Sequence, residues 1–140
     1  MTTRRRQSEV READALVVFG ITGDLARKMT FASLYRLQRR KLLNCPVVGV
    51  AVEDIDAEEL HRRAREALEA SGEQVDEQVF AEFAGKLCYI SGDFADPHTF
   101  TRLADKLKDF QNPTFYLEIP PSLFATVIAG LCKAGLLDHG

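Results

Sequence analysis

The sequence predicts an α/β domain built on a doubly wound, mostly parallel sheet with helices on both faces. Three observations support this fold class. Short apolar runs of strand length alternate with longer segments of helical spacing. Each apolar run is nearly continuous, which is typical of strands buried on both faces of a sheet. The first run leads directly into a glycine turn that opens a helix-like segment.

The alternation is read from four apolar runs and the segments between them. The expected strands are residues 15–19, 47–52, 87–90 and 114–119. The expected helices are residues 24–43, 57–70, 76–86 and 97–110, with a last helix opened by Pro120-Pro121 and continuing to Leu137. Strands joined by helices in this way pair in parallel, so the sequence predicts one open parallel sheet.

Length and composition fit a single domain. The chain has 140 residues, of which 46% are hydrophobic and 28% are charged, and its formal net charge is -3. This charge predicts neither a nucleic-acid partner nor a membrane partner. No apolar run approaches the roughly 20 residues that a membrane-spanning helix needs. Residues 1–14 are polar and are expected to form a disordered leader, with the folded domain over residues 15–140.

Cysteine and histidine give no sign of a metal site. The cysteines, Cys45, Cys88 and Cys132, are odd in number and widely spaced. We expect small buried thiols in a reducing cytoplasm. The histidines are expected on the surface, with no catalytic base among them: His61, His98 and His139.

The turn after the first strand has the pattern G-x-x-G-x-x-A, formed by Gly20, Gly23 and Ala26. The first glycine permits a tight turn, the second lets the backbone approach a diphosphate, and the small alanine lets the helix lie close to the strand. The start of the helix presents unpaired N–H groups to the phosphates. The pattern predicts a Rossmann-type dinucleotide-binding domain. The alternative is a glycine turn that only packs helix on strand.

Acidic residues follow the first two strands. Asp24 is expected either to stabilise the first helical turn, with its side chain toward backbone N–H groups or a basic neighbour, or to contact the ligand. Glu53 follows the second strand, where a carboxylate can accept hydrogen bonds from the adenosine ribose and would repel a 2′-phosphate. A solvated surface position is the alternative for Glu53. Asp56 is expected to cap the next helix.

The third strand is followed by Asp93 and Phe94. An acid and an apolar ring at this place could frame an adenine. The alternative is a plain turn in which Asp96 caps the helix that begins at Pro97. Two other nucleotide-enzyme signatures are absent from the sequence, namely a Tyr followed four residues later by Lys, as in short-chain reductases, and a P-loop.

Three stretches resemble glucose-6-phosphate dehydrogenases, in an actinobacterial-like form. Residues 17–28, V-V-F-G-I-T-G-D-L-A-R-K, are similar to the family's coenzyme fingerprint G-[AV]-[ST]-G-D-L-A-[KR]-[KR]. Residues 115–124, F-Y-L-E-I-P-P-S-L-F, are similar to its F-Y-L-x-[LIM]-P-P-x-x-F. The segment L-Y-R-L at residues 34–37 lies between them, and order and spacing agree over residues 15–137.

The resemblance implies a two-domain enzyme that oxidises glucose 6-phosphate to 6-phosphogluconolactone and passes hydride to NADP or NAD. Its catalytic His, with an Asp partner, is expected beyond residue 140, so no catalytic residue is expected in this chain. The complete enzyme is expected to be a homo-oligomer. The coenzyme contacts expected from the motifs and the resemblance together are Gly20, Ile21, Thr22, Gly23, Asp24, Leu25, Ala26, Glu53, Asp93, Phe94, Ile119 and Pro120.

Two positions depart from the family pattern. Met29 and Ala32 stand where the family has a Lys that reaches the substrate and a Pro. Lys28 is a poor substitute, because one residue turns a helical side chain by about 100°, and Met29 is expected to pack in the core. NADP-specific members often carry Arg where this chain has Val52 and Glu53. We therefore expect altered sugar handling and a preference for NAD, or tolerance of both coenzymes.

Two other interpretations stay open on the sequence alone. A nucleotide-binding module that has lost catalysis is slightly favoured by Met29. An unrelated epimerase or reductase can share the same fold, because a fold does not fix a function. The missing Tyr/Lys pair counts against this second interpretation.

Overall fold

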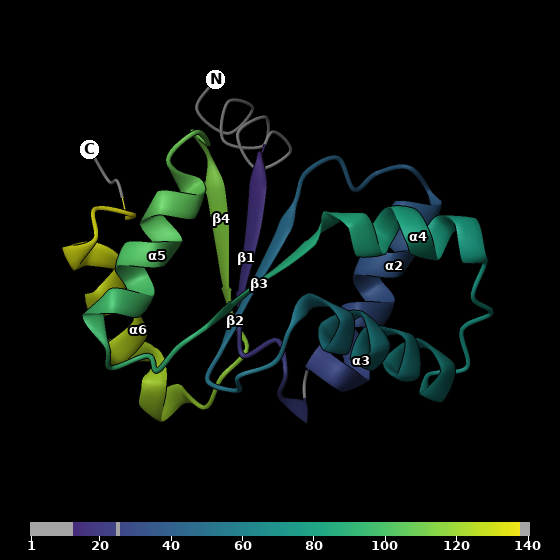
Figure 1. The fold of residues 1–140 in the computed structure, drawn as a ribbon, viewed down its shortest axis with the longest axis horizontal. Coiled ribbons are helices and arrows are strands. Elements are labelled where there is room, and N and C mark those ends of the chain that lie inside the picture. The colour runs from purple at the N-terminus through teal and green to yellow at the C-terminus, as the bar shows by residue number, and fades with distance from the viewer. Residues whose placement is uncertain (1–12, 25, 138–140) are drawn as a thin grey trace, which may run out of the picture.

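The computed structural model describes residues 13–24 and 26–137. Its centre is a parallel four-stranded sheet in the order β3-β2-β1-β4 (Figure 1). The strands are β1 (Ala15–Phe19), β2 (Val47–Ala51), β3 (Leu87–Ser91) and β4 (Pro113–Leu117). The helical elements are the π-helix η1 (Ala26–Thr30), α2 (Phe31–Arg39), α3 (Ala57–Ala70), α4 (Glu77–Lys86), α5 (Pro97–Leu107), the 3-10 helix η2 (Pro121–Leu123) and α6 (Phe124–Lys133).

Two apolar layers hold the sheet between the helices. The helices α2, α3 and α4 cover one face, and α5 and α6 cover the other (Figure 1). In the first layer the rings of Tyr35 and Phe83 meet edge to face, with centroids 6.3 Å apart. In the second layer Phe19 stacks on Phe100 at 6.0 Å. Because side chains of β1 enter both layers, its sequence is continuously apolar. The expected doubly wound sheet is confirmed.

The strand order reverses at β1. This strand pairs in parallel with β2 on one side and with β4 on the other, so Phe19 is in register with Val50 and with Leu117. The chain therefore builds outward through β2 and β3 before it returns to the other side of β1. Ligands of open parallel sheets bind outside the carboxyl ends of the strands at such a reversal. A ligand-binding site is therefore expected among the four turns that follow these strands.

The helix expected over residues 24–43 is interrupted and shorter. It consists of η1 and α2, and α2 ends at Arg39. The next residues form a Schellman turn, in which Lys41 has a φ of 61° and the N–H groups of Lys41 and Leu42 donate to carbonyls of the last helical turn. Because Lys rather than glycine occupies the positive-φ position, the sequence carries no sign of this helix end.

Other boundaries agree more closely. The helix over residues 57–70 begins and ends as expected, and the expected caps are confirmed: Asp56 and Asp96 accept hydrogen bonds from backbone N–H groups of α3 and α5. The last helix does not reach Leu137. It ends at Lys133, because the N–H of Leu136 folds back to the carbonyl of Leu131 at 2.9 Å.

The predicted leader needs one correction. Residues 1–12 lie outside the described part of the chain, but Asp14 belongs to the fold. Its carboxylate accepts hydrogen bonds from the N–H groups of Gln111 and Asn112 at 2.7 and 2.8 Å, which ties the entry of β1 to that of β4. Within the described residues, no helix combines the length and the apolar character needed to cross a bilayer.

Two expectations about reactive side chains are wrong. Cys132 is exposed, so it is not a buried thiol, whereas Cys45 and Cys88 are half-buried and pack against the two apolar layers. His61 on α3 is half-buried, and its Nε2 is enclosed with no hydrogen-bond partner in the described chain. His98 is exposed, as expected, and His139 lies outside the described residues.

Candidate coenzyme-binding site

The turn after β1 is built around Gly20. This residue has a φ of 90°, its N–H donates to the carbonyl of Val50 at 2.7 Å, and its own carbonyl accepts from Gly23 at 2.9 Å. A Cβ at Gly20 would collide with the carbonyl oxygen of Glu118 beyond β4. Glycine is therefore required here both for the backbone conformation and for space. The expected tight turn is confirmed.

The next residues anchor the turn and form its outer wall. Ile21 is fully buried and packs over Gly49 of β2, where an added Cβ would lie 2.6 Å from the Ile21 Cγ2 atom. A nucleotide could therefore reach Ile21 only through its backbone. Thr22 is half-buried and Gly23 is exposed. Leu25 and the side chain of Ala26 lie outside the described residues.

Asp24 has the basic neighbour that a stabilising role requires. Its Oδ1 atom lies 2.6 Å from Nη2 of Arg27, one helical turn later. Both side chains are well exposed. The carboxylate thus offsets one of the positive charges beside the glycine turn.

Glu53 lies two residues beyond β2 and is held from two directions. Its carboxylate pairs with Nη1 of Arg63 on α3 at 3.0 Å. Its backbone carbonyl accepts a hydrogen bond of 2.5 Å from the hydroxyl of Tyr89 on β3. Burial, together with the nearby Glu53 carboxylate, raises the pKa of Tyr89 to about 12. The phenol therefore remains a donor at neutral pH and fixes the loop that carries Glu53.

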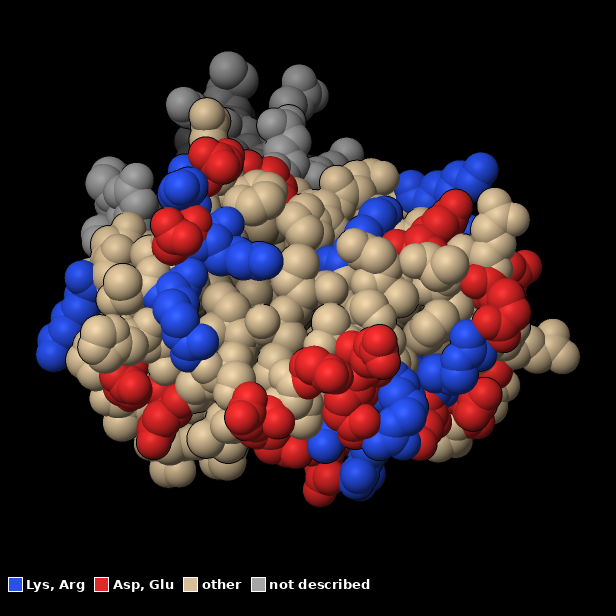
Figure 2. All heavy atoms as spheres, viewed as in Figure 1, with Lys and Arg blue, Asp and Glu red and all other residues tan. Residues whose placement is uncertain are grey.

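Arg63 is in turn fixed by its own helix. Its Nε donates to Glu59 at 2.9 Å, whereas the neighbouring Arg62 pairs with Glu59 and with Glu66. Hydrogen bonds from Arg62 and then from Arg63 lower the pKa of the Glu59 carboxyl. Acidic and basic side chains are accordingly interleaved over α3, at the lower right of the molecule (Figure 2).

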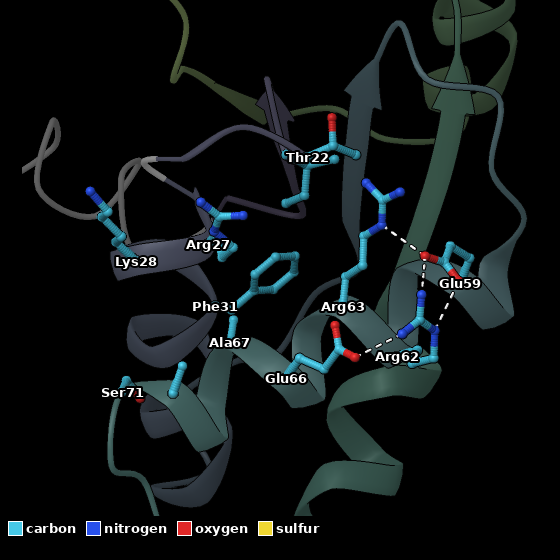
Figure 3. Close-up of a pocket in the computed structure, with 12 residues that line it drawn as sticks. Thr22, Arg27, Lys28, Phe31, Glu59, Arg62, Arg63, Glu66, Ala67 and Ser71 are labelled. Atoms are coloured by element: carbon cyan, nitrogen blue, oxygen red, sulfur yellow. Dashed lines mark hydrogen bonds and ion pairs between the residues drawn. The ribbon is translucent and has the colours of Figure 1, made fainter.

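A cleft of about 580 Å³ lies between η1 and α3, beside the glycine turn. Figure 3 shows Arg63 extending from α3 on the side of Thr22, while Arg62 turns toward Glu66. The lining side chains that carry charge are Arg27, Lys28, Arg62, Arg63, Glu59 and Glu66. Four basic groups thus face two acidic ones, so the cleft is suited to an anionic ligand.

The turn after β3 is held by a local hydrogen bond. Asp93 accepts a hydrogen bond from the N–H of Ala95 at 2.8 Å, which closes a local turn. The ring of Phe94 meets Phe19 edge to face, with centroids 5.7 Å apart. Both residues lie at the carboxyl edge of the sheet, so their contact with an adenine stays a prediction.

A contact that the sequence did not reveal joins η1 to the end of β4. The hydroxyl of Thr30 lies 2.5 and 2.6 Å from the two carboxylate oxygens of Glu118. The Glu118 N–H also donates to the carbonyl of Phe19 at 2.9 Å. The next residue, Ile119, is half-buried, and Pro120 after it is exposed. This end of the site is therefore tied to the first strand and to η1 together.

The expectation that Met29 packs in the core is wrong, because its side chain is 60% exposed. The expectation rests on a spacing of four residues, which places two side chains on one face of an α-helix. Met29 lies in η1, and the wider π-helical turn shifts that alignment.

The sequence also missed Arg63. The i,i+4 spacing of Glu59 and Arg63 predicts their pairing within one helix. The contact of Arg63 with Glu53 depends on how α3 turns back beside the loop, which no local spacing reveals.

The fold and the glycine turn define a class, the dinucleotide-binding α/β domains. Comparison with known proteins identifies the family. The family model described as "Glucose-6-phosphate dehydrogenase, NAD binding domain" matches residues 17–140. This chain belongs to that family, as the resemblance in its motifs implied.

Individual relatives agree. Glucose-6-phosphate 1-dehydrogenase 1 of Mycobacterium tuberculosis is 46% identical over 127 residues, which are 91% of this chain and 27% of that protein. The crystal structure of glucose-6-phosphate 1-dehydrogenase from Mycobacterium avium superposes with a TM-score of 0.87 at 53% identity, covering 90% of this chain and 28% of that one. A glucose-6-phosphate dehydrogenase in complex with its substrate gives 0.81 at 26% identity, covering 91% and 28%.

The chain thus spans little more than a quarter of the length of these relatives, 27% for the M. tuberculosis enzyme. The matches favour a dehydrogenase domain over a module without catalysis and over an epimerase or reductase.

Proposed function

We propose that this chain is the coenzyme domain of an enzyme that oxidises glucose 6-phosphate to 6-phosphogluconolactone and transfers hydride to NAD or NADP. The observation that carries the proposal is the glycine turn at the strand-order reversal, in a chain of this family. The turn fits a diphosphate, because no side chain projects from Gly20 or Gly23 at the edge where parallel sheets bind nucleotides.

Each part of the dinucleotide has candidate partners along this edge. The backbone of residues 20–24 and of the start of η1 would bind the diphosphate. Glu53 would accept hydrogen bonds from the adenosine ribose, and Asp93 and Phe94 would lie beside the adenine. Ile119 and Pro120 would border the nicotinamide, which accepts the hydride when the coenzyme is bound. We assign no catalytic base among the described residues.

Glu53 supports a preference for NAD, or tolerance of both coenzymes. A carboxylate at this position accepts from the two ribose hydroxyls of NAD and opposes the 2′-phosphate of NADP. The Tyr89 hydrogen bond holds the loop in place for this contact.

Met29 supports weaker binding of the sugar phosphate. Its exposed thioether stands where the family has a substrate Lys, and it cannot donate a hydrogen bond to a phosphate. We expect Met29→Lys in the complete enzyme to lower the KM for glucose 6-phosphate. Lys28→Met is the matched control and should leave the KM nearly unchanged. An unchanged KM in Met29→Lys would argue against a role for this position.

Gly23→Ala tests the proposal as a whole. An added Cβ at Gly23 would lie 3.3 Å from the carbonyl oxygen of Gly20, a contact that a small shift relieves. The variant should therefore fold, but its methyl group would meet the diphosphate. We expect calorimetric binding of NAD and NADP by the complete enzyme to be lost with little change in Tm. Undiminished binding in Gly23→Ala, or no oxidation of glucose 6-phosphate by the wild-type enzyme, would refute it.

A further inference from the structure

The Arg63–Glu53 ion pair lies where the adenosine ribose is expected. We infer that Arg63 is the ligand of the 2′-phosphate of NADP and that Glu53 occupies its binding face when no phosphate is present. The pair would then select between the coenzymes by exchange of one anion for another. This inference rests on the proposed function, because it requires a dinucleotide at this edge of the sheet.

The geometry of Arg63 suits such an exchange. Glu59 accepts from Nε at 2.9 Å, and Glu53 pairs with Nη1 at 3.0 Å. If Glu53 moves away, Glu59 still holds the plane of the guanidinium in the same direction. The vacated Nη1 position would then face an incoming anion, and phosphate oxygens suit the planar, multidentate donor set of arginine.

Exposure makes the exchange inexpensive. Glu53 is 43% exposed and Arg63 is 32% exposed, so the Glu53 carboxylate can turn into solvent. Ion pairs of this exposure typically contribute about 0–1 kcal/mol. A dianionic phosphate competes well for the same guanidinium, because hydrogen bonds between charged partners strengthen with the charge of the acceptor.

The surrounding cleft adds to the attraction. Thr22, with a hydroxyl donor, and Lys28 line the same cleft as Arg63. Lys28 has no ion-pair partner among the residues that the structure describes. The other cation from η1, Arg27, is already paired with Asp24. Lys28 therefore stays available to the phosphorylated ribose, whereas Arg27 and Arg62 are occupied by carboxylates.

With NAD the same residues take other roles. The 2′-hydroxyl is a donor, and Glu53 can accept from it while it stays paired with Arg63. NAD therefore binds without breaking the pair, and NADP binds by breaking it. A carboxylate after β2 thus does not exclude NADP from this chain.

Arg62 provides a matched control. It is the adjacent residue of α3, with the same charge and length, but it pairs with Glu59 and Glu66, whereas Arg63 pairs with Glu53. A general loss of positive charge from α3 would affect the two positions alike. Only a specific phosphate contact would separate them.

The test measures Kd for NAD and for NADP by calorimetry, on the complete enzyme and on its variants. Arg63→Gln should weaken NADP binding by about 10-fold or more and change NAD binding by no more than about 2-fold, the loss typical of one charged hydrogen-bonding partner. Glu53→Gln should tighten NADP binding and weaken NAD binding. Arg62→Gln should leave the ratio of the two constants unchanged. Arg63→Lys and a thermal melt separate lost contacts from misfolding.

The outcomes are distinct. If the wild-type enzyme binds neither coenzyme, the proposed function fails and this inference fails with it. If both bind but Arg63→Gln changes them equally, or Arg62→Gln shows the same selective loss, the inference is wrong and the proposed function stands. A selective loss of NADP in Arg63→Gln alone supports the inference.

Discussion

Charged side chains surround the carboxyl edge of the sheet beside β2 and α3, whereas exposed apolar ones flank it beside β4 and α6. At the first end, Arg63 pairs with Glu53 and Glu59 on a partly solvated surface. At the second, the hydroxyl of Thr30 contacts the carboxylate of Glu118. The exposed apolar side chains around the second end are Tyr116, Leu123, Phe124 and Ile128.

The difference concerns how each end responds to a ligand. Exposed ion pairs are weak and exchange partners readily. A hydrogen bond from a half-buried hydroxyl to a carboxylate is stronger and holds one geometry. We therefore expect the ion pairs at the β2 end to exchange partners more readily than the Thr30–Glu118 contact at the β4 end.

Among the polar contacts at the two ends, removing the carboxylate of Glu118 should have the largest effect on stability. Glu118→Ala deprives Thr30 of its acceptor, and we expect the free energy of unfolding to fall by about 2 kcal/mol. Urea denaturation of this chain measures it. Glu118→Gln, which keeps an acceptor oxygen, should lose less than half as much. Equal stability of Glu118→Ala and wild type would show that the contact does not fix η1.

Tyr89→Phe should have a smaller effect, at the opposite end. It removes the hydrogen bond to the Glu53 carbonyl and should cost about 1 kcal/mol. The loop that carries Glu53 would also be held less firmly. We therefore expect the free energy of NAD binding to fall by more than the free energy of unfolding.

The pH dependence of this contribution has a definite sign. The pKa of Tyr89 is raised from 10.0 to about 12 in the folded protein, so folding favours the protonated phenol. The extra stability is complete below pH 10 and is lost as pH rises through about 12. Titration of phenolate absorbance should show a late ionisation step in the wild type that is missing from Tyr89→Phe. Ionisation near pH 10 would contradict this environment for Tyr89.

The strands and most helices could be predicted from the sequence. A strand that is buried on both faces of a sheet needs apolar residues at nearly every position, and this gives a continuous apolar run in the sequence. The glycine turn could also be predicted, because a tight turn and a close approach of the backbone to a diphosphate require glycine at the spacing of Gly20 and Gly23. The end of α2 was not, because Lys41 adopts the positive φ that is usually reserved for glycine. The exposure of Met29 could not be predicted for a similar reason, because the spacing of apolar residues does not distinguish a π-helical turn from an α-helical one.

Contacts between segments that are far apart in the sequence could not be predicted either. Glu53 could be singled out because its place after a strand has a known chemical meaning. Its partner Arg63 lies ten positions later on a helix face, and Thr30 and Glu118 are separated by 88 positions. Such pairs are fixed by how elements pack, so the structure was needed to find them.

The smallest expected effect concerns the apolar surface of α6, where two adjacent residues differ sharply. Val127 is fully buried and Ile128 is 44% exposed. We expect Ile128→Lys to change the free energy of unfolding by less than about 0.5 kcal/mol, whereas Val127→Ala should cost about 2 kcal/mol. Light scattering should also show less self-association for Ile128→Lys, because it interrupts an apolar patch. If Ile128→Lys lowers the free energy of unfolding as much as Val127→Ala does, this face of α6 is covered in solution. The apolar side chains at the β4 end would then be buried against a partner and not exposed to solvent.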